Sequence, residues 1–282
     1  MARAASVTSR LRVPSGKVRL DDYDPSATPG FSGRKRDGEG ALRALAPELA
    51  DLQERLFANA KAAGDTRSLL LVLQGMDTSG KGGVLRSAVG IFDPQGVQIR
   101  SFKAPSAIER KHDFLWRIEK EVPAAGMVGI FDRSHYEDVL IARVRKLAPA
   151  KEIERRYRAI NDFEARLAAS GTVIVKCMLH ISAEEQRKRL LARLDDPTKH
   201  WKFNPGDVDE RALWSDYQKA YELALERCNA EAAPWLVVPS DKKWYRNWVV
   251  ARVLFEALDA LGLAWPKGMF DVEEQKQRLA AT

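Results

Sequence analysis

The chain has 282 residues, of which 45% are hydrophobic and 30% charged. These values allow a sizeable core and exclude a disordered or fibrous protein. No apolar run reaches the ~20 residues that a membrane span needs, and two cysteines, Cys177 and Cys228, are too few for a disulfide framework. Because the first residues also lack the apolar stretch of a secretory signal, we expect a cytoplasmic protein.

Most of the formal net charge of +7 lies near the amino terminus. Residues 1–36 contain eight Lys or Arg and three Asp, so this segment contributes +5. It is also rich in Gly, Pro and Ser, which predicts a basic, poorly packed arm that contacts a neighbouring subunit. The remaining residues, 37–282, are expected to form a single domain. The overall charge therefore says little about an active site.

Apolar periodicity predicts the elements that follow the arm. Between residues 37 and 63 leucines recur every three or four positions, which predicts a helix. Short apolar runs predict strands at 68–73, 97–102, 127–131, 172–180 and 235–239, with stretches of helical length between them. Such alternation predicts an α/β fold with a parallel sheet covered by helices. The charged stretch at about 182–214, interrupted by Pro197 and Pro205, is expected to form a separate lid.

The most specific motif lies between the strand at 68–73 and an expected helix at 82–90. Residues 75–81 match G-x-x-x-x-G-K, in which amide groups and the helix amino terminus face phosphate oxygens and Lys81 adds a positive charge. An ordinary Gly-rich turn is the alternative. The backbone positions expected to contact phosphate are Gly75, Thr78, Ser79, Gly80, Gly82 and Gly83.

One position in this loop departs from the usual pattern, because Gly82 replaces the Ser or Thr that normally holds Mg²⁺. Asp77, inside the loop, offers a carboxylate oxygen of the kind that Mg²⁺ prefers. Alternatively, Asp77 stabilises the turn through an Asx-type hydrogen bond.

A second acidic position follows the strand at 127–131. Asp132 stands at the carboxyl end of this strand, where open α/β sheets bind ligands and where phosphate-loop enzymes hold Mg²⁺. The next residue, Arg133, could neutralise the oxygens of a transferring phosphoryl group. A structural salt bridge is the alternative for Arg133.

The residues after Arg133 have a structural explanation of their own. Ser134 and Glu137 have the spacing of a capping box, which predicts a helix over 135–146. A functional role for Glu137 stays equally open. His135 is expected to be structural, because transfer to an anionic phosphate oxygen needs no general base.

Two basic groups remain. A helix that begins at Ser182 carries Arg187 and Arg193, either as a solvated face or as part of a lid over an anionic substrate. Lys103 and Arg117 belong to a second group, which follows the strand at 97–102 and is expected to face the same edge of the sheet.

Eight separated blocks of the sequence together resemble the second family of polyphosphate kinases. They lie at residues 75–83, 114–117, 130–140, 179–186, 195–197, 201–203, 233–235 and 243–246. The similarity extends over about residues 41–263, and Gly82 is normal in that family. The segment 18–25 resembles the branch that accepts both nucleoside mono- and diphosphates.

The resemblance implies a polyphosphate-dependent nucleotide kinase that transfers the terminal phosphoryl group of inorganic polyphosphate reversibly to ADP or AMP, with Mg²⁺. It implies a three-layer α/β/α sandwich of the thymidylate-kinase-like, P-loop kinase type with a helical lid, assembled as a homodimer or homotetramer. The catalytic residues that it implies are Asp77, Lys81, Asp132 and Arg133, with Asp77 and Asp132 holding the metal. Arg187 and Arg193 fall in the stretch that resembles the lid.

Polyphosphate is a linear polyanion, so its binding requires cations at intervals. The residues expected to contact it are Lys103, Arg117, Arg187 and Arg193, and the other expected ligands are ADP, AMP and ATP. We expect neither nucleic acid nor membrane as a partner. Two alternatives remain: an ATP-dependent nucleoside monophosphate kinase, which needs the same loop and lid, and a non-enzymatic module that binds nucleic acid through its basic surface.

Overall fold

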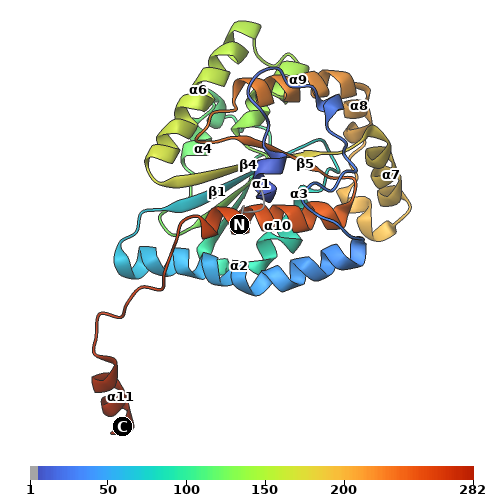
Figure 1. Ribbon diagram of the computed structural model, residues 1–282. Coiled ribbons are helices and arrows are strands. Elements are labelled where there is room, and N and C mark those ends of the chain that lie inside the picture. Colours follow the sequence, from blue (N-terminus) through green and yellow to red (C-terminus); the bar gives the residue numbers. More distant parts are fainter. Residues whose placement is uncertain (1–5) are drawn as a thin grey trace.

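The structure is a computed structural model, and it describes residues 6–282. Its centre is a sheet of five parallel strands in the order β2-β3-β1-β4-β5 (Figure 1). The strands are β1 (Ser68–Gln74), β2 (Val97–Ser101), β3 (Val128–Asp132), β4 (Thr172–His180) and β5 (Trp235–Pro239). All five predicted strands and the parallel sheet are thus confirmed.

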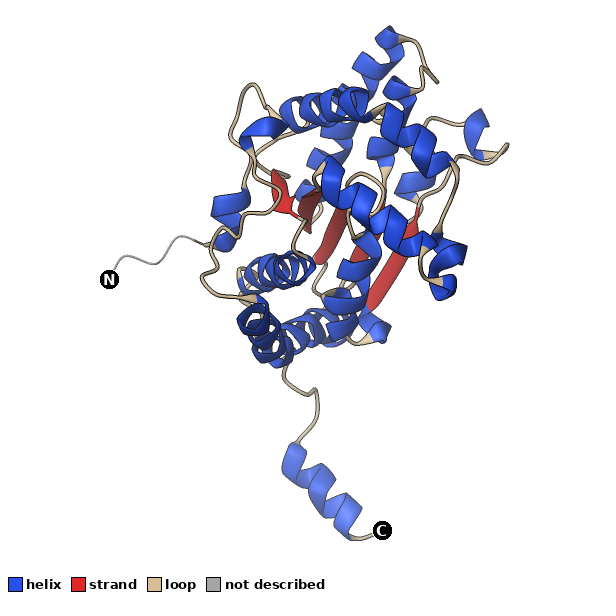
Figure 2. Cartoon of the chain, turned by 90° about the vertical axis from the view of Figure 1, so that its right-hand side faces the viewer, coloured by secondary structure: helices blue, strands red, loops and turns tan. Residues whose placement is uncertain are grey.

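Helices cover both faces of the sheet, as the side view in Figure 2 shows. Those on one face are α1 (Val7–Leu11), α2 (Lys35–Ala63), α3 (Lys81–Ser87) and α10 (Lys243–Asp259); those on the other are α4 (Trp116–Glu119), α5 (Ile141–Val144), α6 (Ala150–Ala169) and α9 (Trp214–Arg227). A hydrophobic core lies between each helical layer and the sheet. Alternate residues of β1 point to opposite faces, so Leu71 packs in the first core and Leu70 in the second. The three-layer α/β/α architecture is therefore confirmed.

The stretch predicted as a lid is helical. It contains α7 (Ala183–Leu194), the 3₁₀ segment η6 (Pro197–Lys202) and α8 (Gly206–Ala212), which lie together beside the carboxyl edge of the sheet (Figure 1). At the other extreme, α11 (Val272–Ala280) stands apart from the body at the end of an extended segment (Figures 1 and 2). No helix within residues 6–282 has both the length and the apolar character to cross a bilayer. The remaining short 3₁₀ segments are η1 (Leu20–Asp22), η2 (Val89–Ile91), η3 (Pro94–Gly96), η4 (Glu109–Lys111) and η5 (His135–Asp138).

The amino-terminal segment is packed, contrary to the prediction. The Val13 amide donates to the carbonyl of Trp235 at 2.9 Å, which attaches the segment beside β5. Val13, Val18 and Leu20 are buried in the core shared with β1 and α9. The prediction of a poorly packed arm over residues 1–36 is therefore wrong for residues 6–33, because these apolar side chains outweigh the local Gly and Pro content, and for 34–36, which start α2. Residues 1–5 lie outside the described residues. Contact with a neighbouring subunit stays a prediction.

The predicted helix over 135–146 is also wrong. The chain forms η5 and then, after two residues outside helical geometry, the short helix α5. His135 and Tyr136 both hydrogen-bond to one buried carboxylate, Glu164, at 3.2 and 2.8 Å. This anchoring of two successive side chains fixes a tighter turn than the helical pattern requires.

Candidate functional site

The loop at residues 75–80 connects the central strand β1 to α3 and needs glycine at both ends. Gly75 has φ +154°, and a Cβ there would lie 2.7 Å from the carbonyl oxygen of Leu179. Gly80 has φ +114°, and a Cβ there would overlap the guanidinium of Arg246. Both residues are therefore required by backbone conformation and by close neighbours. This is the strand-loop-helix context that the phosphate-loop motif demands.

The Lys81 side chain spans the phosphate loop. Its Nζ donates to the carbonyl of Gly75 at 2.8 Å, across the loop from the first residue of α3. Burial, followed by the nearby Arg133, lowers the pKa of Lys81, while the carboxylates of Asp77, Asp132 and Glu137 oppose that shift. The ammonium group thus lies among the carboxylates and the arginine that the motifs contribute.

The parallel register brings Asp132 and Arg133 to the loop. Asp132 is paired with Leu73 at the carboxyl end of β1, and the Arg133 amide donates to the Leu73 carbonyl at 3.1 Å. Arg133 is left-handed, with φ +65°, and its Nη2 donates to Asp77 Oδ1 at 2.9 Å. Burial disfavours its charge, but Glu137 and Asp77 outweigh this effect and raise the pKa of Arg133. All four predicted catalytic residues therefore meet at one place.

A cavity of about 270 Å³ opens beside this cluster. Its lining comes from the phosphate loop, the segment after β3, the lid and α9. The lining residues are Gly75, Met76, Asp77, Arg133, Glu137, Ile141, Arg145, Gln186, Asn204, Gly206, Asp207, Glu210, Tyr217 and Tyr221. Because it has both carboxylates and guanidinium groups on its walls, the cavity can accommodate a ligand that carries phosphate and cation together.

Glu137 belongs to this cavity and forms no capping box. Ser134 Oγ accepts from the Tyr136 amide at 3.2 Å and not from the Glu137 amide, so the predicted box is absent. In the amide orientation that satisfies its neighbours, Gln74 donates to Glu137 Oε1 at 3.0 Å. Burial raises the pKa of Glu137, and Arg133 and Lys81 oppose this shift. Of the two readings left open for Glu137, the geometry favours a place in the site.

His135 lies behind the site in a buried polar cluster, consistent with the structural role predicted for it. Its Nε2 is 3.2 Å from Glu164 Oε1, which, as a carboxylate, can only accept. Lys176 Nζ donates to Glu164 Oε2 at 2.6 Å and to Tyr136 Oη at 2.8 Å. We name His135, Tyr136, Glu164 and Lys176 the buried polar cluster; it holds the turn that carries Glu137.

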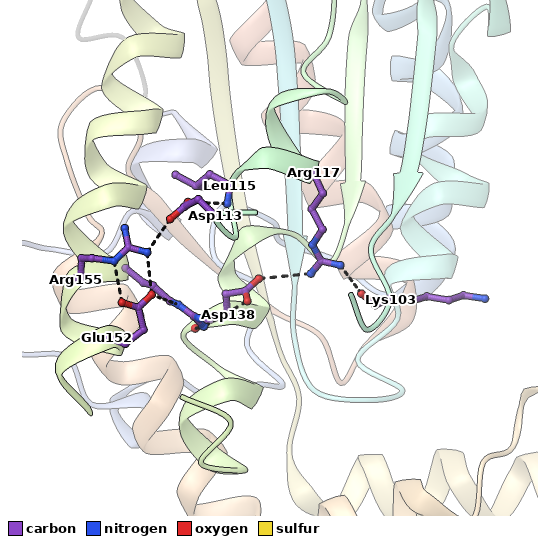
Figure 3. Close-up of polar contacts among 8 residues, drawn as sticks. Lys103, Asp113, Leu115, Arg117, Asp138, Glu152 and Arg155 are labelled. Carbon is purple, nitrogen blue, oxygen red and sulfur yellow. Dashed lines mark hydrogen bonds and ion pairs between the residues drawn. The ribbon is translucent and has the colours of Figure 1, made fainter. Parts of the chain in front are cut away.

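The predicted polyphosphate contacts Lys103 and Arg117 are placed differently from each other (Figure 3). Arg117 is buried, and its guanidinium donates to the Lys103 carbonyl at 2.7 Å and to Asp138 at 3.5 Å. It thus fixes the segment after β2 to the turn after β3. The Lys103 side chain is exposed and points away from Arg117 (Figure 3). Direct contact of either residue with phosphate stays a prediction.

The two predicted lid arginines, Arg187 and Arg193, also differ in exposure and in hydrogen bonding. Arg187 is exposed on α7. Arg193 donates to the carbonyl of Lys202 at 3.0 Å and to Asp207 at 3.5 Å, so it joins α7 to η6 and α8. Their contact with substrate stays a prediction as well.

Three further residues, whose roles the sequence motifs did not indicate, hold the phosphate loop by its carbonyl groups. Arg189, on α7, donates to the carbonyls of Thr78 at 2.9 Å and Ser240 at 2.7 Å. Gln186, one helical turn earlier, donates to the Asp77 carbonyl at 3.0 Å, and Arg246 reaches the Ser79 carbonyl at 3.1 Å. The spacing of Gln186 and Arg189 places them on one helix face, but only the fold shows what that face contacts.

The residues present fit a magnesium ion that is completed by substrate. Within residues 6–282, no three His, Cys, Asp or Glu side chains form a group that could hold a metal by themselves. Asp77 and Asp132 both raise the pKa of Lys81 against the effect of burial, so both carboxylates lie near its ammonium group. Mg²⁺ is commonly held by one or two carboxylates together with substrate phosphates and water, which matches this donor set.

Comparison with known proteins gives one consistent result. The family model described as polyphosphate kinase 2 (PPK2) matches residues 33–263. The chain is 45% identical over 254 residues to the AMP/ADP-polyphosphate phosphotransferase of Meiothermus ruber, covering 90% of this chain and 93% of that protein. It is 41% identical over 273 residues to the ADP-polyphosphate phosphotransferase of Rhodopseudomonas palustris, covering 92% of each. The crystal structure of polyphosphate kinase 2 from Arthrobacter aurescens TC1 is similar with a TM-score of 0.96 and 56% identity, covering 99% of this chain and 98% of that one.

Proposed function

This chain belongs to the polyphosphate kinase 2 family, and from that premise we propose how its site transfers the terminal phosphoryl group of inorganic polyphosphate to ADP or AMP. The observation that carries the proposal is the convergence of Asp77, Lys81, Asp132 and Arg133 beside a cavity of about 270 Å³. These groups can bind, align and neutralise phosphates. No covalent enzyme intermediate is required, because positioning and charge neutralisation suffice for phosphoryl transfer.

In this proposal the loop and its lysine bind the donor. The amide groups of residues 75–80 and the amino terminus of α3 face the terminal phosphates, and Lys81 contributes a positive charge. Arg133, now paired with Asp77, turns its guanidinium to the transferring group, whose negative charge replaces that carboxylate as partner. Attack by a phosphate oxygen of the acceptor then breaks the bond to the polyphosphate chain.

Asp77 and Asp132 are the residues that would hold Mg²⁺. When bound, the ion would neutralise phosphate charge and orient donor and acceptor. Asp77, which would help to hold the ion, is also the present ion-pair partner of Arg133, so the same carboxylate lies next to both the metal and the phosphate positions. The two carboxylates thus serve the metal, and the two cations serve the phosphates.

We propose that both AMP and ADP are acceptors. The Meiothermus ruber relative is named for both, and the segment 18–25 resembles the branch that accepts mono- and diphosphates. The decisive assay is nucleotide formation by purified protein from Mg²⁺, long-chain polyphosphate and either ADP or AMP. ATP formation only in the presence of polyphosphate supports the proposal. Phosphorylation of AMP by ATP alone, unaffected by polyphosphate, would instead favour the ATP-dependent kinase.

Variants of the site test the individual roles. Lys81→Ala, Asp77→Asn and Asp132→Asn should each lower kcat at least about 10²-fold, as expected for loss of one group that stabilises transition-state charge. Lys61→Ala, an exposed position on α2, is the matched control and should retain full activity. Near-normal turnover in any of the three variants, with the control equally active, would remove that residue from the mechanism.

We also propose a homo-oligomer in a cytoplasmic setting. Both cysteines are free and buried, which is compatible with a reducing compartment. The extended segment before α11 exposes Met269 to 94% and Phe270 to 62%, and a second copy of the chain would cover them. Light scattering of the Met269→Ser/Phe270→Ser variant should show a smaller mass than the parent. An unchanged mass would exclude this segment as the contact.

A further inference from the structure

A second cavity, of about 310 Å³, lies behind the phosphate loop on the face of α2 and α10. Its lining includes Lys35, Glu39, Arg43, Lys243, Trp244 and Asn247, and it shares no residue with the cavity beside Arg133. Because α10 starts directly after β5, its first turn stands at the carboxyl edge of the sheet, near the phosphate loop (Figure 1). This cavity takes no part in the catalysis proposed above.

A glycine brings the two helix starts together at this cavity. A Cβ on Gly38, in the first turns of α2, would overlap the ring of Trp244 in the first turn of α10. The absence of that Cβ allows the two helices to approach each other here. Lys35 and Lys243, the first residues of these helices, therefore line the same cavity.

Cations at these positions oppose the intrinsic charge of the helices. The amino terminus of a helix carries partial positive charge, so Lys and Arg are unfavourable there. Nevertheless α2 starts with Arg34, Lys35 and Arg36 against one acidic residue, Asp37, which accepts from the Arg34 amide, and α10 starts with Lys242 and Lys243 and has no acidic residue in its first turn. Helix stability does not explain this arrangement, whereas a bound anion would.

Internal partners compensate little of this charge. Lys35 Nζ lies 3.7 Å from Glu39, in a pair whose side chains are 73% and 46% exposed, and such pairs contribute little. Among the described residues 6–282, Arg43 and Lys243 have no carboxylate within salt-bridge distance. The cavity therefore presents three cations against one carboxylate.

Hydrogen bonds connect this cavity directly with the phosphate loop. Asn247 donates to Ser87 Oγ at 2.9 Å and accepts from Arg246 Nη2 at 2.8 Å. Arg246 in turn donates to the Ser79 carbonyl at 3.1 Å. From Lys81 to Ser87, α3 rises only about 9 Å. The two sites are therefore separated by about the length of α3.

Charges of the lid also approach the cavity. Burial lowers the pKa of Lys243; Arg189, Arg246 and Lys199 of η6 add to this shift and Glu185 opposes it, so three cations and one carboxylate lie near Lys243. Lys199 and Lys243 are exposed, whereas Arg189 and Arg246 are buried and donate to carbonyl groups.

We propose that this cavity, with Lys35, Arg43 and Lys243, is an outer binding site for inorganic polyphosphate that holds the chain beyond the phosphates at the catalytic loop. The inference rests on the proposed function, in which only the end of a long polyanion reacts. The remaining phosphates retain charge that must be neutralised, and displacement of their counterions favours binding. Nucleic acid is disfavoured as occupant, because the one aromatic residue of the cavity, Trp244, packs on Gly38 and offers no free ring for base stacking.

The test compares donors of different length. The triple variant Lys35→Ala/Arg43→Ala/Lys243→Ala is assayed with ADP and either tripolyphosphate, which is too short to fill both sites, or a chain of more than about 100 phosphates. We expect KM for the long chain to rise roughly tenfold, while kcat and KM for tripolyphosphate stay within about twofold. The slope of log KM against log salt for the long chain should also fall by roughly 0.7 for each cation that no longer neutralises a phosphate.

The control variant Lys61→Ala/Arg158→Ala/Lys267→Ala removes the same charge from exposed positions elsewhere and should leave both donors unaffected. An unchanged KM for the long chain in the test variant would overturn the proposal, as would an equal rise for both donors. Competition by a single-stranded oligonucleotide at equal phosphate concentration, abolished in the test variant, would assign the surface to nucleic acid and also overturn it. Absence of transfer from every donor by the parent protein would instead refute the proposed function.

Discussion

The pKa values of two glutamates near the turn after β3, Glu164 and Glu137, are shifted in opposite directions. Burial would raise the pKa of Glu164, but Lys176 and the hydrogen bond from His135 outweigh it, so the pKa is lowered. Burial raises the pKa of Glu137, and there the cations Arg133 and Lys81 oppose the shift without reversing it. Glu164 forms a 2.6 Å ion pair, whereas Glu137 has no salt-bridge partner among residues 6–282.

The difference separates a charge that supports the fold from charges reserved for ligands. In the buried polar cluster each charged group has several partners within the protein, so nothing else can bind there. Around the phosphate loop the partners are incomplete: Arg133 and Asp77 form one 2.9 Å contact and remain 42% and 28% exposed. Because Arg133 and Asp77 are only partly paired and line an accessible cavity, they can exchange each other for groups of the substrate.

The largest effect is expected from Arg133→Ala. Loss of an arginine that neutralises a transferring phosphoryl group typically lowers kcat by 10³-fold or more, and we expect at least about 10³-fold here. Because the Arg133–Asp77 pair is partly exposed, its loss should change the free energy of unfolding by less than about 1 kcal/mol. Steady-state kinetics and thermal melting measure the two quantities. A strong loss of stability would show that the pair belongs to the fold instead.

Lys176→Met should have the reverse pattern. It leaves Glu164 buried without its cation, and breaking a buried pair on one side costs roughly 3–5 kcal/mol. The expected fall in Tm is of order 10 °C. At a temperature where the variant is folded, kcat should stay within a few-fold of the parent. If activity disappeared while Tm held, the cluster would have a role in catalysis.

Replacing both partners sharpens the comparison. Lys176→Met/Glu164→Leu removes the uncompensated charge and should recover roughly 1–3 kcal/mol relative to Lys176→Met. Recovery should be incomplete, because His135 and Tyr136 lose the carboxylate to which they bond. Denaturant unfolding of the parent and both variants gives the free energy of unfolding that the second substitution recovers. A double variant no more stable than Lys176→Met would mean that packing, and not charge, dominates the cluster.

The smallest effect concerns Glu137→Gln, measured as stability against pH. A carboxyl group whose pKa is raised on folding favours the folded state below its unfolded pKa, and this contribution is lost as pH rises through the folded value. The charged Glu137 therefore lowers stability at neutral pH, and the glutamine variant should melt a few degrees higher there. The difference should vanish below the ordinary glutamate pKa of about 4.3. A variant that is less stable at neutral pH would show that the Glu137 charge is paired.

Prediction from the sequence failed where local and tertiary preferences disagree. The Gly and Pro residues of the amino-terminal segment favour a loose arm, yet Leu20 is only 1% exposed, because a distant core surface accepts it. The spacing of Ser134 and Glu137 favours a capped helix, yet Glu164 anchors His135 and Tyr136 in a tighter turn. Contacts far away in the chain decided both outcomes, and such contacts are invisible to local patterns.

The candidate site likewise combines features that local sequence patterns predict with contacts that only the fold reveals. Local patterns were sufficient to specify the five parallel strands, the phosphate loop and the acidic strand end, because buried strands and Gly-rich turns depend on local composition and on periodicity. They also placed Asp132 at the carboxyl edge, since parallel strands end together. The assembled fold was needed to show that Arg117 faces inward to Asp138 and that Arg189 and Arg246 hold the phosphate loop. A guanidinium group sits on a long, flexible side chain, so its partners depend on which distant carbonyl and carboxylate groups the fold brings within reach.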